Sequence, residues 1–440
     1  MQSYWFDEIL AQLTFKQKKV LEAFLAGQTD REIARSLVVE TSTIRRHITN
    51  ICKAFGLTNN PGEHYSYREE LIALFVRYQP EMVAFKLKED PSLATLKFPD
   101  TPLKPGSPFY IFRPPIERRC QQEIAKPGAM IRIRGSQRTG KTSLVNLILH
   151  HARQGSDLLC SQAEPDRAIS LNLRQAEKRV LSDLDLFLRW FALNIAHLLG
   201  IETQIEDSWD SQYFGSVASC TIYFQTQILA KTTSSVAIAL DNLDWLFEFP
   251  EIARGFFPML RSWHEEANSM QVWQKLKLIV AYSTEVYIPL DINQSPFNVG
   301  MPVKLPELTA KGILELAHKY HLDWSINETQ KLMAMVSGHP YLVQLALYHL
   351  QNEDISLERL LQLAPTQARI YNSILRQYWQ TFQQHPELAE GFKTLLFSKT
   401  PVQLKPILAY KLESMGLIEL QGNFLQISCQ LYRQYFQSYL

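Results

Sequence analysis

Residues 130–153 read MIRIRGSQRTGKTSLVNLILHHAR, and this stretch decides the fold of the chain. Its central part, GSQRTGKT at 135–142, fits the pattern GxxxxGK[ST] in full. Glycine lets the backbone turn so that its N–H groups point inward and cradle phosphate oxygens. A strand pattern precedes the loop and a helical pattern follows it, which is the order that this motif requires. A chance glycine-rich turn is the alternative, and it does not account for that order.

The chemistry of this loop points to a nucleotide and a magnesium ion. Lys141 supplies a positive charge for the β- and γ-phosphates, and Thr142 supplies a hydroxyl for magnesium. The helix that begins near Lys141 presents the positive end of its dipole to the same anion. We therefore expect ATP and Mg²⁺ as cofactors. The predicted nucleotide-binding residues of the loop are Gly135, Ser136, Gln137, Arg138, Thr139, Gly140, Lys141, Thr142 and Ser143.

A second polar group follows the apolar run in SVAIALDNLDWLF at 235–247. A buried strand that ends in an acid is how a P-loop protein places a carboxylate beside magnesium. Asp241 is therefore predicted to be a metal ligand together with Thr142. Asp244, one helical turn further on, is equally well explained as a helix cap.

A third polar group ends the apolar run LKLIVAY at 276–282. Open α/β sheets bind ligands at the carboxyl ends of their strands. Ser283 and Thr284 are therefore candidates to sense the γ-phosphate. Ordinary capping of a strand end by hydroxyl groups explains them equally well.

The remaining sequence shows how the chain is organised. It has 440 residues, 46% of them apolar and 20% charged, which is typical of a globular protein with several domains. Strand and helix patterns alternate between about 129 and 283, which predicts a parallel sheet covered by helices on both faces. Beyond about Met301 the pattern is helical, until GLIELQGNFLQIS at 416–428 predicts a β-hairpin. Five prolines between 89 and 108 indicate a linker.

Charge and cysteine content limit the partners and the compartment. The formal net charge is +1, so any contact with nucleic acid has to come from a local basic patch. The five cysteines form no CxxC pair, which argues against a zinc site or a disulfide framework and fits a reducing cytosol. The first residues, MQSYWFDEIL, lack the pattern of a signal peptide. We expect a cytoplasmic protein with no membrane partner.

From about residue 106 to 440 the chain resembles the AAA-like ATPases of many cyanobacterial proteins, within the broader AAA+/STAND group. Besides the phosphate loop, the resemblance is carried by FYIFRPPIERRCQQEI at 109–124, LDNLDWLF at 240–247 and SGHPYLVQLALYHL at 337–350. It implies an ATPase core, a helical lid and a C-terminal winged helix. It also implies that Gly338 and Pro340 bring the lid onto the nucleotide.

The chain departs from that group at one position. Related ATPases usually have an acid directly after the magnesium-binding aspartate, and here the residue is Asn242. An amide can orient water but cannot accept its proton at neutral pH. The sequence therefore predicts slow hydrolysis, with Asp241, Asn242, Ser283 and Thr284 as the catalytic group. For the arginine finger that the group implies, Arg254 and Arg261 are candidates, although an isolated arginine on a helix is more often a solvated surface residue.

The N-terminal segment resembles helix-turn-helix domains of the LuxR type, and those of cyanobacterial proteins linked to vWA–MoxR conflict systems. The stretches LTFKQKKVLEAFLAGQTDREIARSL and TSTIRRHITNICKAFGL carry this resemblance. The second stretch then corresponds to the recognition helix, with Ile44, Ile48 and Ile51 facing the core. The residues predicted to approach DNA are Thr43, Arg45, Arg46 and Thr49. A face that docks another protein is the alternative.

These observations predict a multidomain chain that joins helix-turn-helix, P-loop AAA+-like, lid and winged-helix parts. The expected boundaries are a helix-turn-helix domain at 1–88, a linker at 89–108, an α/β core with a parallel sheet at 109–302, a helical lid at 303–352 and a winged-helix domain at 353–440.

We expect an ATP-binding, nucleotide-controlled switch that reads DNA or a partner protein. Homo-oligomers and an effector protein are possible partners, because AAA+ and STAND proteins commonly assemble. Two alternatives remain open. One is a DNA-remodelling or loader ATPase, against which Asn242 counts. The other is a signalling scaffold of a defence or conflict system that does not bind DNA.

Overall fold

A computed structural model describes residues 2–57, 67–84, 98–154, 166–202, 204–283, 298–352, 355–366, 370–398, 402–421 and 424–440. The chain divides into two compact units. The first contains Met1–Pro99, Tyr320–Asp323 and Leu347–Ser356, and the second contains Asp100–Lys319, Trp324–Ala346 and Leu357–Leu440. Within the described ranges, no helix has both the length and the apolar character needed to cross a bilayer.

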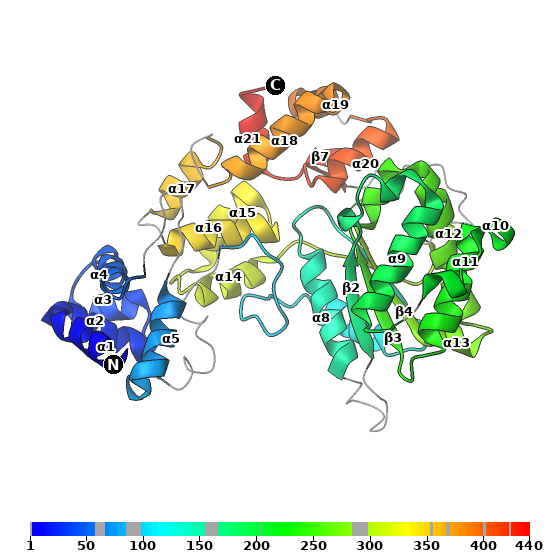
Figure 1. Ribbon diagram of the computed structural model, residues 1–440. Coiled ribbons are helices and arrows are strands. Elements are labelled where there is room, and N and C mark those ends of the chain that lie inside the picture. Colours follow the sequence, from blue (N-terminus) through cyan, green and yellow to red (C-terminus); the bar gives the residue numbers. More distant parts are fainter. Residues whose placement is uncertain are drawn as a thin grey trace. The chain divides into compact units, whose positions relative to one another are not determined.

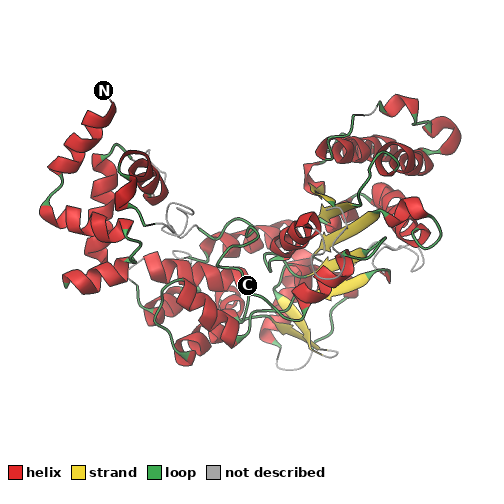
Figure 2. Cartoon of the chain, turned by 90° about the horizontal axis from the view of Figure 1, so that it is seen from below, coloured by secondary structure: helices red, strands yellow, loops and turns green. Residues whose placement is uncertain are grey.

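The N-terminal part of the first unit is a small helical bundle (Figure 2). Thr14 and Thr29 cap the second and third helices through reciprocal capping boxes with Gln17 and Glu32. The expectation that Ile44, Ile48 and Ile51 face the core is confirmed, since all three are buried. Its elements are α1 (Gln2–Gln12), α2 (Phe15–Leu25), α3 (Asp30–Leu37), α4 (Thr41–Ala54), α5 (Arg68–Tyr78) and η1 (Pro80–Met82).

The second unit is built on a parallel sheet, as the alternating pattern predicts. The spatial order of the strands is β2-β3-β4-β1-β5, and every described pairing between them is parallel. The strands are β1 (Met130–Arg134), β2 (Arg167–Asn172), β3 (Val236–Asp241), β4 (Leu276–Tyr282) and β5 (Met301–Lys304).

Strand β5 is an addition to the sequence analysis, which reads the chain beyond Met301 as helical. It is four residues long and contains Pro302, which removes one backbone donor. Such a residue is tolerated on an edge strand, and among the described strands β5 pairs with β1 alone. The sheet therefore continues past 302, where the boundary between core and lid is expected.

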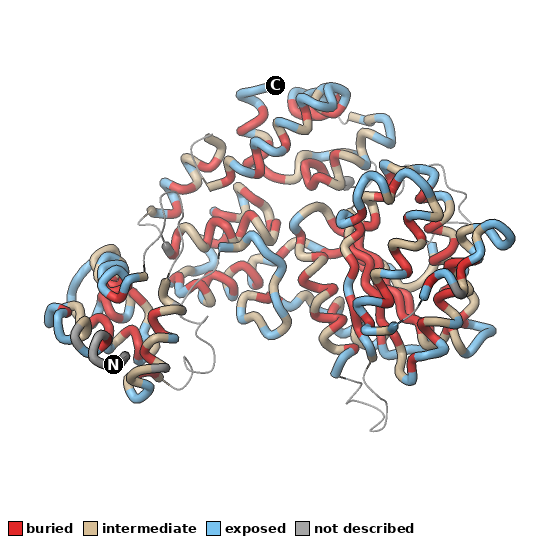
Figure 3. The backbone as a smooth tube through the Cα atoms, in the orientation of Figure 1, coloured by how far each residue is buried: buried red, intermediate tan, exposed pale blue. Residues whose placement is uncertain are grey.

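Helices cover both faces of the sheet (Figure 1). Alternate residues of β3 explain this arrangement, because Ile238 and Leu240 pack among α9 and α12, whereas Ala237 and Ala239 pack against α7 and α8. All six residues of β3 are buried, and the strands form a buried layer in Figure 3. The covering helices are α7 (Ile116–Ile124), α8 (Lys141–Gln154), α9 (Leu184–Leu198), α11 (Ser216–Tyr223), α12 (Pro250–Glu266) and α13 (Gln271–Gln274).

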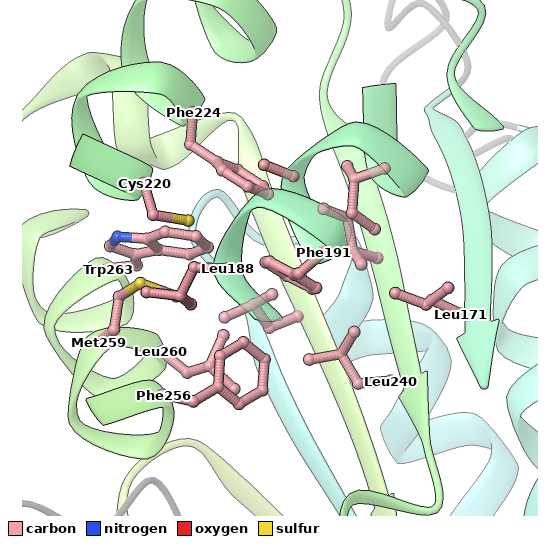
Figure 4. Close-up of a cluster of buried hydrophobic side chains, with 14 of the residues drawn as sticks. Leu171, Leu188, Phe191, Cys220, Phe224, Leu240, Phe256, Met259, Leu260 and Trp263 are labelled. Atoms are coloured by element: carbon pink, nitrogen blue, oxygen red, sulfur yellow. The ribbon is translucent and has the colours of Figure 1, made fainter. Parts of the chain in front are cut away.

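One face of the sheet carries an aromatic cluster (Figure 4). Phe191 of α9 stacks on Phe224 with ring centroids 5.4 Å apart and meets the edge of Phe256 at 5.0 Å. Trp263 lies 4.4 Å from Phe224, and its indole N–H donates to Thr221 Oγ1 at 3.0 Å. Ring pairs in these geometries stabilise beyond their buried area. The cluster holds α9 and α12 together above β3 and β4.

In sequence order, the remaining elements come between the sheet strands and after β5. The short ones are η3 (Leu173–Gln175), η4 (Val180–Ser182), η5 (Ile205–Asp207), α10 (Ser211–Phe214), η6 (Phe224–Leu229) and η7 (Leu243–Glu248). After β5 come α14 (Ala310–Lys319), α15 (Ile326–Val336), α16 (Pro340–Asn352), α17 (Leu357–Leu363), α18 (Asn372–Gln384), α19 (Pro386–Phe397), α20 (Pro406–Ser414), β6 (Ile418–Gln421), β7 (Phe424–Ile427) and α21 (Gln430–Gln437). Strands β6 and β7 pair antiparallel, which confirms the predicted hairpin.

Replacing Phe191 by alanine should destabilise the second unit strongly. Phe191 is fully buried, and truncation leaves a cavity among three aromatic neighbours. The expected loss is about 3–5 kcal/mol, measured as a fall in the denaturant midpoint. Leu193→Ala is the matched control, because Leu193 is an exposed residue of the same helix and should change stability by less than about 0.5 kcal/mol. Equal effects of the two changes would contradict this account.

Candidate nucleotide-binding site

The predicted phosphate loop lies at the carboxyl end of β1 and leads directly into α8. Gly140 has φ +96°, a conformation that glycine adopts without strain. Gly135 is needed for another reason, because a Cβ there would lie 2.7 Å from Thr139 Oγ1. Thr139 Oγ1 in turn donates to the Ser136 carbonyl at 2.8 Å, which fixes the loop internally. The two glycines of the motif therefore have distinct structural roles.

Lys141 is buried at the centre of the site. Its Nζ donates to the carbonyl oxygens of Gly135 and Ser136, each at 2.9 Å, and to Ser283 Oγ at 3.0 Å. Burial lowers the pKa of the Lys141 ammonium to about 8, although the carboxylates of Asp244 and Asp241 act in the opposite direction. The structure thus brings together the predicted lysine and the predicted Ser283.

Thr142 and Asp241 form the predicted metal pair. Thr142 Oγ1 donates to Asp241 Oδ2 at 2.8 Å, and Asp241 is buried. A hydroxyl and a carboxylate are oxygen ligands of the kind that magnesium takes together with phosphate oxygens and water. Within the described ranges there is no cluster of three or more His, Cys, Asp or Glu residues that could hold a metal ion. The Thr142 hydroxyl and the Asp241 carboxylate fit a magnesium ion that takes its other ligands from nucleotide phosphates and water.

Asn242 follows Asp241 and adopts a left-handed conformation, with φ 57°. Asparagine accepts this conformation more readily than most residues. Its Nδ2 donates to Asn172 Oδ1 at 3.1 Å, so its side chain faces the end of β2. The sequence analysis does not include Asn172. The polar end of the AISLN strand pattern, which stands level with Asp241 in the sheet, is the signal that could have found it.

Asp244 is part of the site rather than only a helix cap. Its Oδ1 accepts a hydrogen bond from the backbone N–H of Ser283 at 3.1 Å. Burial raises the pKa of the Asp244 carboxyl, while the Lys141 ammonium acts in the opposite direction. Asp244 thereby connects the ends of β3 and β4. The predicted Thr284 lies outside the described residues.

Arg113 was missed by the sequence analysis. It comes from RPP at 113–115 in the segment before α7, and its Nη1 donates to the Thr139 carbonyl at 3.1 Å. Its other terminal nitrogen lies next to Gly140, where a Cβ would be 3.3 Å from it. The predicted Ser143 instead accepts the Leu103 N–H at 3.0 Å, so its hydroxyl is used to anchor a preceding segment.

The Gly-His-Pro element approaches the loop through its histidine. Gly338 is required by close packing, since a Cβ would lie 2.2 Å from the Leu308 carbonyl oxygen, and Pro340 begins α16. His339 Nε2 lies 3.1 Å from the Gln137 carbonyl oxygen. Burial lowers the pKa of His339 to about 4, so the imidazole is neutral at pH 7 and donates its Nε2–H to this carbonyl.

The C-terminal elements contact the same loop. The Gln137 N–H donates to the Ser414 carbonyl at 3.1 Å, and Arg134 forms an ion pair with Glu413 at 2.9 Å. Arg138, with φ 60°, places its guanidinium 4.4 Å from the centre of the Tyr341 ring. Gln137 is therefore bonded to α20 through its N–H and to the Gly-His-Pro element through its carbonyl. Sequence spacing gives no signal for these contacts.

The predicted DNA-contacting residues differ in exposure. Arg46 and Thr49 are exposed on α4, whereas Thr43 is half-buried. Arg45 lies 3.5 Å from Asp30, which also accepts two hydrogen bonds from Arg68 at 2.9 and 2.8 Å. Arg45 also contacts the Gln351 carbonyl within the first unit. The Arg45 charge is therefore already engaged by protein groups.

Comparison with known proteins agrees with this geometry. Residues 98–438 match the AAA-like domain family, so the chain belongs to that family. Residues 11–62 match the family of bacterial regulatory proteins of the luxR type. The chain therefore combines a nucleotide-binding AAA-like P-loop domain with a LuxR-type helix-turn-helix region. No curated protein matches the sequence significantly.

Several solved structures are similar to this chain at low sequence identity, and the first of those named below has a TM-score above 0.5. The Walker-type ATPase of Pyrococcus abyssi is 13% identical with a TM-score of 0.52, and the match covers 78% of this chain and 100% of that one. The ORC2 protein of Aeropyrum pernix is 14% identical with a TM-score of 0.44, covering 76% and 98%. A signal-transduction ATPase with numerous domains from Pyrococcus horikoshii is 16% identical with a TM-score of 0.32, covering 78% and 44%.

Lys141→Ala should abolish tight ATP binding while the protein stays folded. The change removes the charge at the centre of the loop, and a charge-assisted contact to phosphate contributes about 1.5–3 kcal/mol. Calorimetric titration with ATP and magnesium measures the effect. Lys178→Ala is the control, because Lys178 is exposed and lies outside the loop. Unchanged ATP affinity in Lys141→Ala would refute the site.

His339 should make the second unit sensitive to acid. Its pKa is about 4 when folded and 6.5 in the reference state, so the unfolded chain binds more protons between these values. Stability is therefore retained above pH 6.5 and falls as the pH drops toward 4, by about 2 kcal/mol between pH 7 and 5. His339→Gln keeps a donor for Gln137 and should lose less stability over this range. Thermal unfolding of wild type and His339→Gln at pH 7 and pH 5 measures these losses. Equal losses of stability in the two proteins would contradict the prediction.

Proposed function

We propose that the chain is an ATP- and magnesium-controlled switch whose helix-turn-helix region binds DNA. The observation that carries the switch is the bonding of Gln137, which donates to Ser414 and accepts from His339. One residue of the phosphate loop is thereby joined to two later parts of the chain. A nucleotide that alters the loop alters both contacts together.

Such a switch requires that the nucleotide makes more favourable contacts with one arrangement of the chain than with the other. A ligand shifts an equilibrium between two arrangements only if it binds one of them more tightly. The Ser414 carbonyl accepts the Gln137 N–H, which is a backbone donor of the loop on which nucleotide phosphates would bind. A phosphate oxygen and this carbonyl oxygen would compete for the same N–H, so nucleotide would bind more tightly to an arrangement in which the Ser414 contact is released.

Slow hydrolysis is part of the same proposal. Asn242 cannot act as a general base, and its amide is directed to Asn172. Lys141, Thr142 and Asp241 would hold ATP and magnesium, and the ion would neutralise charge on the phosphates. A protein that binds ATP firmly and hydrolyses it slowly stays in one state for longer than a motor does.

DNA binding is proposed for the exposed face of α4. Arg46 and Thr49 lie on this face, while Arg45 is engaged by Asp30. We therefore propose that Arg46, and not Arg45, contacts the DNA phosphates, and that the neighbouring Thr49 also faces the DNA. Measuring ATP hydrolysis and assembly size with and without duplex DNA tests the whole proposal, because a loader ATPase would turn over faster with DNA.

ATP should change amide hydrogen exchange in two segments distant in sequence from the loop. These are the end of α20 with β6, which includes Ser414, and the start of α16 with His339, which directly precedes it. The reason is that both segments bond to Gln137. The same exchange experiment on Lys141→Ala should show no change with ATP. If wild-type protein binds ATP without altered exchange in either segment, the switch is refuted.

Arg46→Ala should weaken binding to duplex DNA and flatten its salt dependence. Losing one phosphate contact reduces the slope of log K against log salt by about 0.9. Lys16→Ala removes the same charge from an exposed position on α2 and is the control. Fluorescence anisotropy across a salt series gives both slopes. Identical behaviour of the two variants would favour the protein-docking alternative for α4.

A further inference from the structure

An arginine that the sequence analysis did not select lies at the edge of the site. Arg174 follows β2 by two residues, in η3. The last residue of β2, Asn172, stands level with Asp241 in the parallel pairing of β2 and β3. The chain therefore carries Arg174 to the same carboxyl edge of the sheet as the phosphate loop and the predicted metal ligand.

Hydrogen bonds fix the Arg174 backbone relative to Asp241. The Arg174 N–H donates to Asn172 Oδ1 at 3.0 Å, and the same oxygen accepts from Asn242 Nδ2 at 3.1 Å. The Asn242 N–H in turn donates to Asp241 Oδ1 at 2.9 Å. These three bonds run without interruption from the metal-binding carboxylate to Arg174. Asn242 is thus a positioning residue, and this explains an amide at that place.

The Arg174 side chain is held by a ring and not by an acid. Its guanidinium lies 5.9 Å from the centre of the Trp245 ring, within the range of a cation–π contact. In the part of the chain that the structure describes, no ion pair involves Arg174. Arg174 lies close enough to Lys141 and Asp244 to interact electrostatically with both.

The two arginines suggested by the sequence are placed differently. Arg254 and Arg261 pair with Glu251 and Glu265 of their own helix, at 2.6 and 2.8 Å. Those contacts are short-range pairs along α12 and do not connect it to the phosphate loop. Arg174 differs from them, because its charge pairs with no acid among the described residues and its backbone is linked to Asp241 through Asn172 and Asn242.

We propose that Arg174 acts within the same chain as the arginine that contacts the terminal phosphate of bound ATP. The proposal rests on ATP binding at the loop, as put forward above. A guanidinium offers several donors in a planar fork that matches phosphate oxygens. Because ADP lacks that phosphate, Arg174 gives the site a preference for ATP over ADP.

The test compares the affinities of wild type, Arg174→Ala and Arg174→Lys for ATP and for ADP, by calorimetry with magnesium. Arg174→Ala should weaken ATP binding about 10-fold or more. ADP affinity should change less than about 2-fold, which also shows that the variant is folded. Arg174→Lys keeps a charge without the fork and should lie between them. Arg179→Ala, an exposed arginine nearby, is the matched control and should bind both nucleotides as wild type does.

Asn242→Ala tests the positioning role. In the wild-type background, Asn242→Ala should lower the preference for ATP over ADP. In the Arg174→Ala background it should have no such effect, because the guanidinium that Asn242 positions is already absent. Unchanged ATP affinity in Arg174→Ala, or equal losses for ATP and ADP, would overturn the proposal for Arg174. Failure of wild type to bind ATP would instead overturn the proposed function.

Discussion

The hydrogen bond between Thr142 and Asp241 is the contact on which the site depends. It joins the helix after β1 to the end of β3, although β4 lies between these strands in the sheet. The bond forms only if all three strands run parallel and end at the same edge. Buried apolar residues on both faces of β3 and β4 hold that alignment. The chemistry at the edge is thus a consequence of packing along the sheet.

The sequence was sufficient to place the groups that depend on local spacing. The loop from Gly135 to Thr142 and the acid at Asp241 stand next to strand patterns, and the parallel α/β fold follows from them. It was insufficient for contacts between segments far apart in the chain. Arg113 and Asn172 meet the site through folding, and each is a single polar residue without a spacing rule. For His339, the family resemblance implied the Gly-His-Pro element but not its contact with the Gln137 carbonyl. Strand β5 was missed because it is short and contains proline.

Asn242 shows how a residue changes meaning once its conformation is known. In the sequence, Asn242 is only a residue that stands where an acid is expected. In the structure its left-handed backbone and its amide bond to Asn172 give it a positive role. A carboxylate at this place would meet the Asn172 oxygen acceptor to acceptor, which is unfavourable. The same residue therefore lacks the acid that the resemblance implies and supplies the hydrogen bond to Asn172.

The peptide groups on either side of Gln137 lead to a further consequence. One gives its N–H to Ser414 and the next gives its carbonyl to His339. Rotating either peptide plane breaks a bond to a separate segment, and a buried polar group left unbonded is costly. The loop therefore cannot relax alone, and its mechanical stiffness depends on residues at least 202 positions away in the sequence. Substitutions in α16 or α20 should therefore change the flexibility of the loop, although they leave the sequence of the motif unchanged.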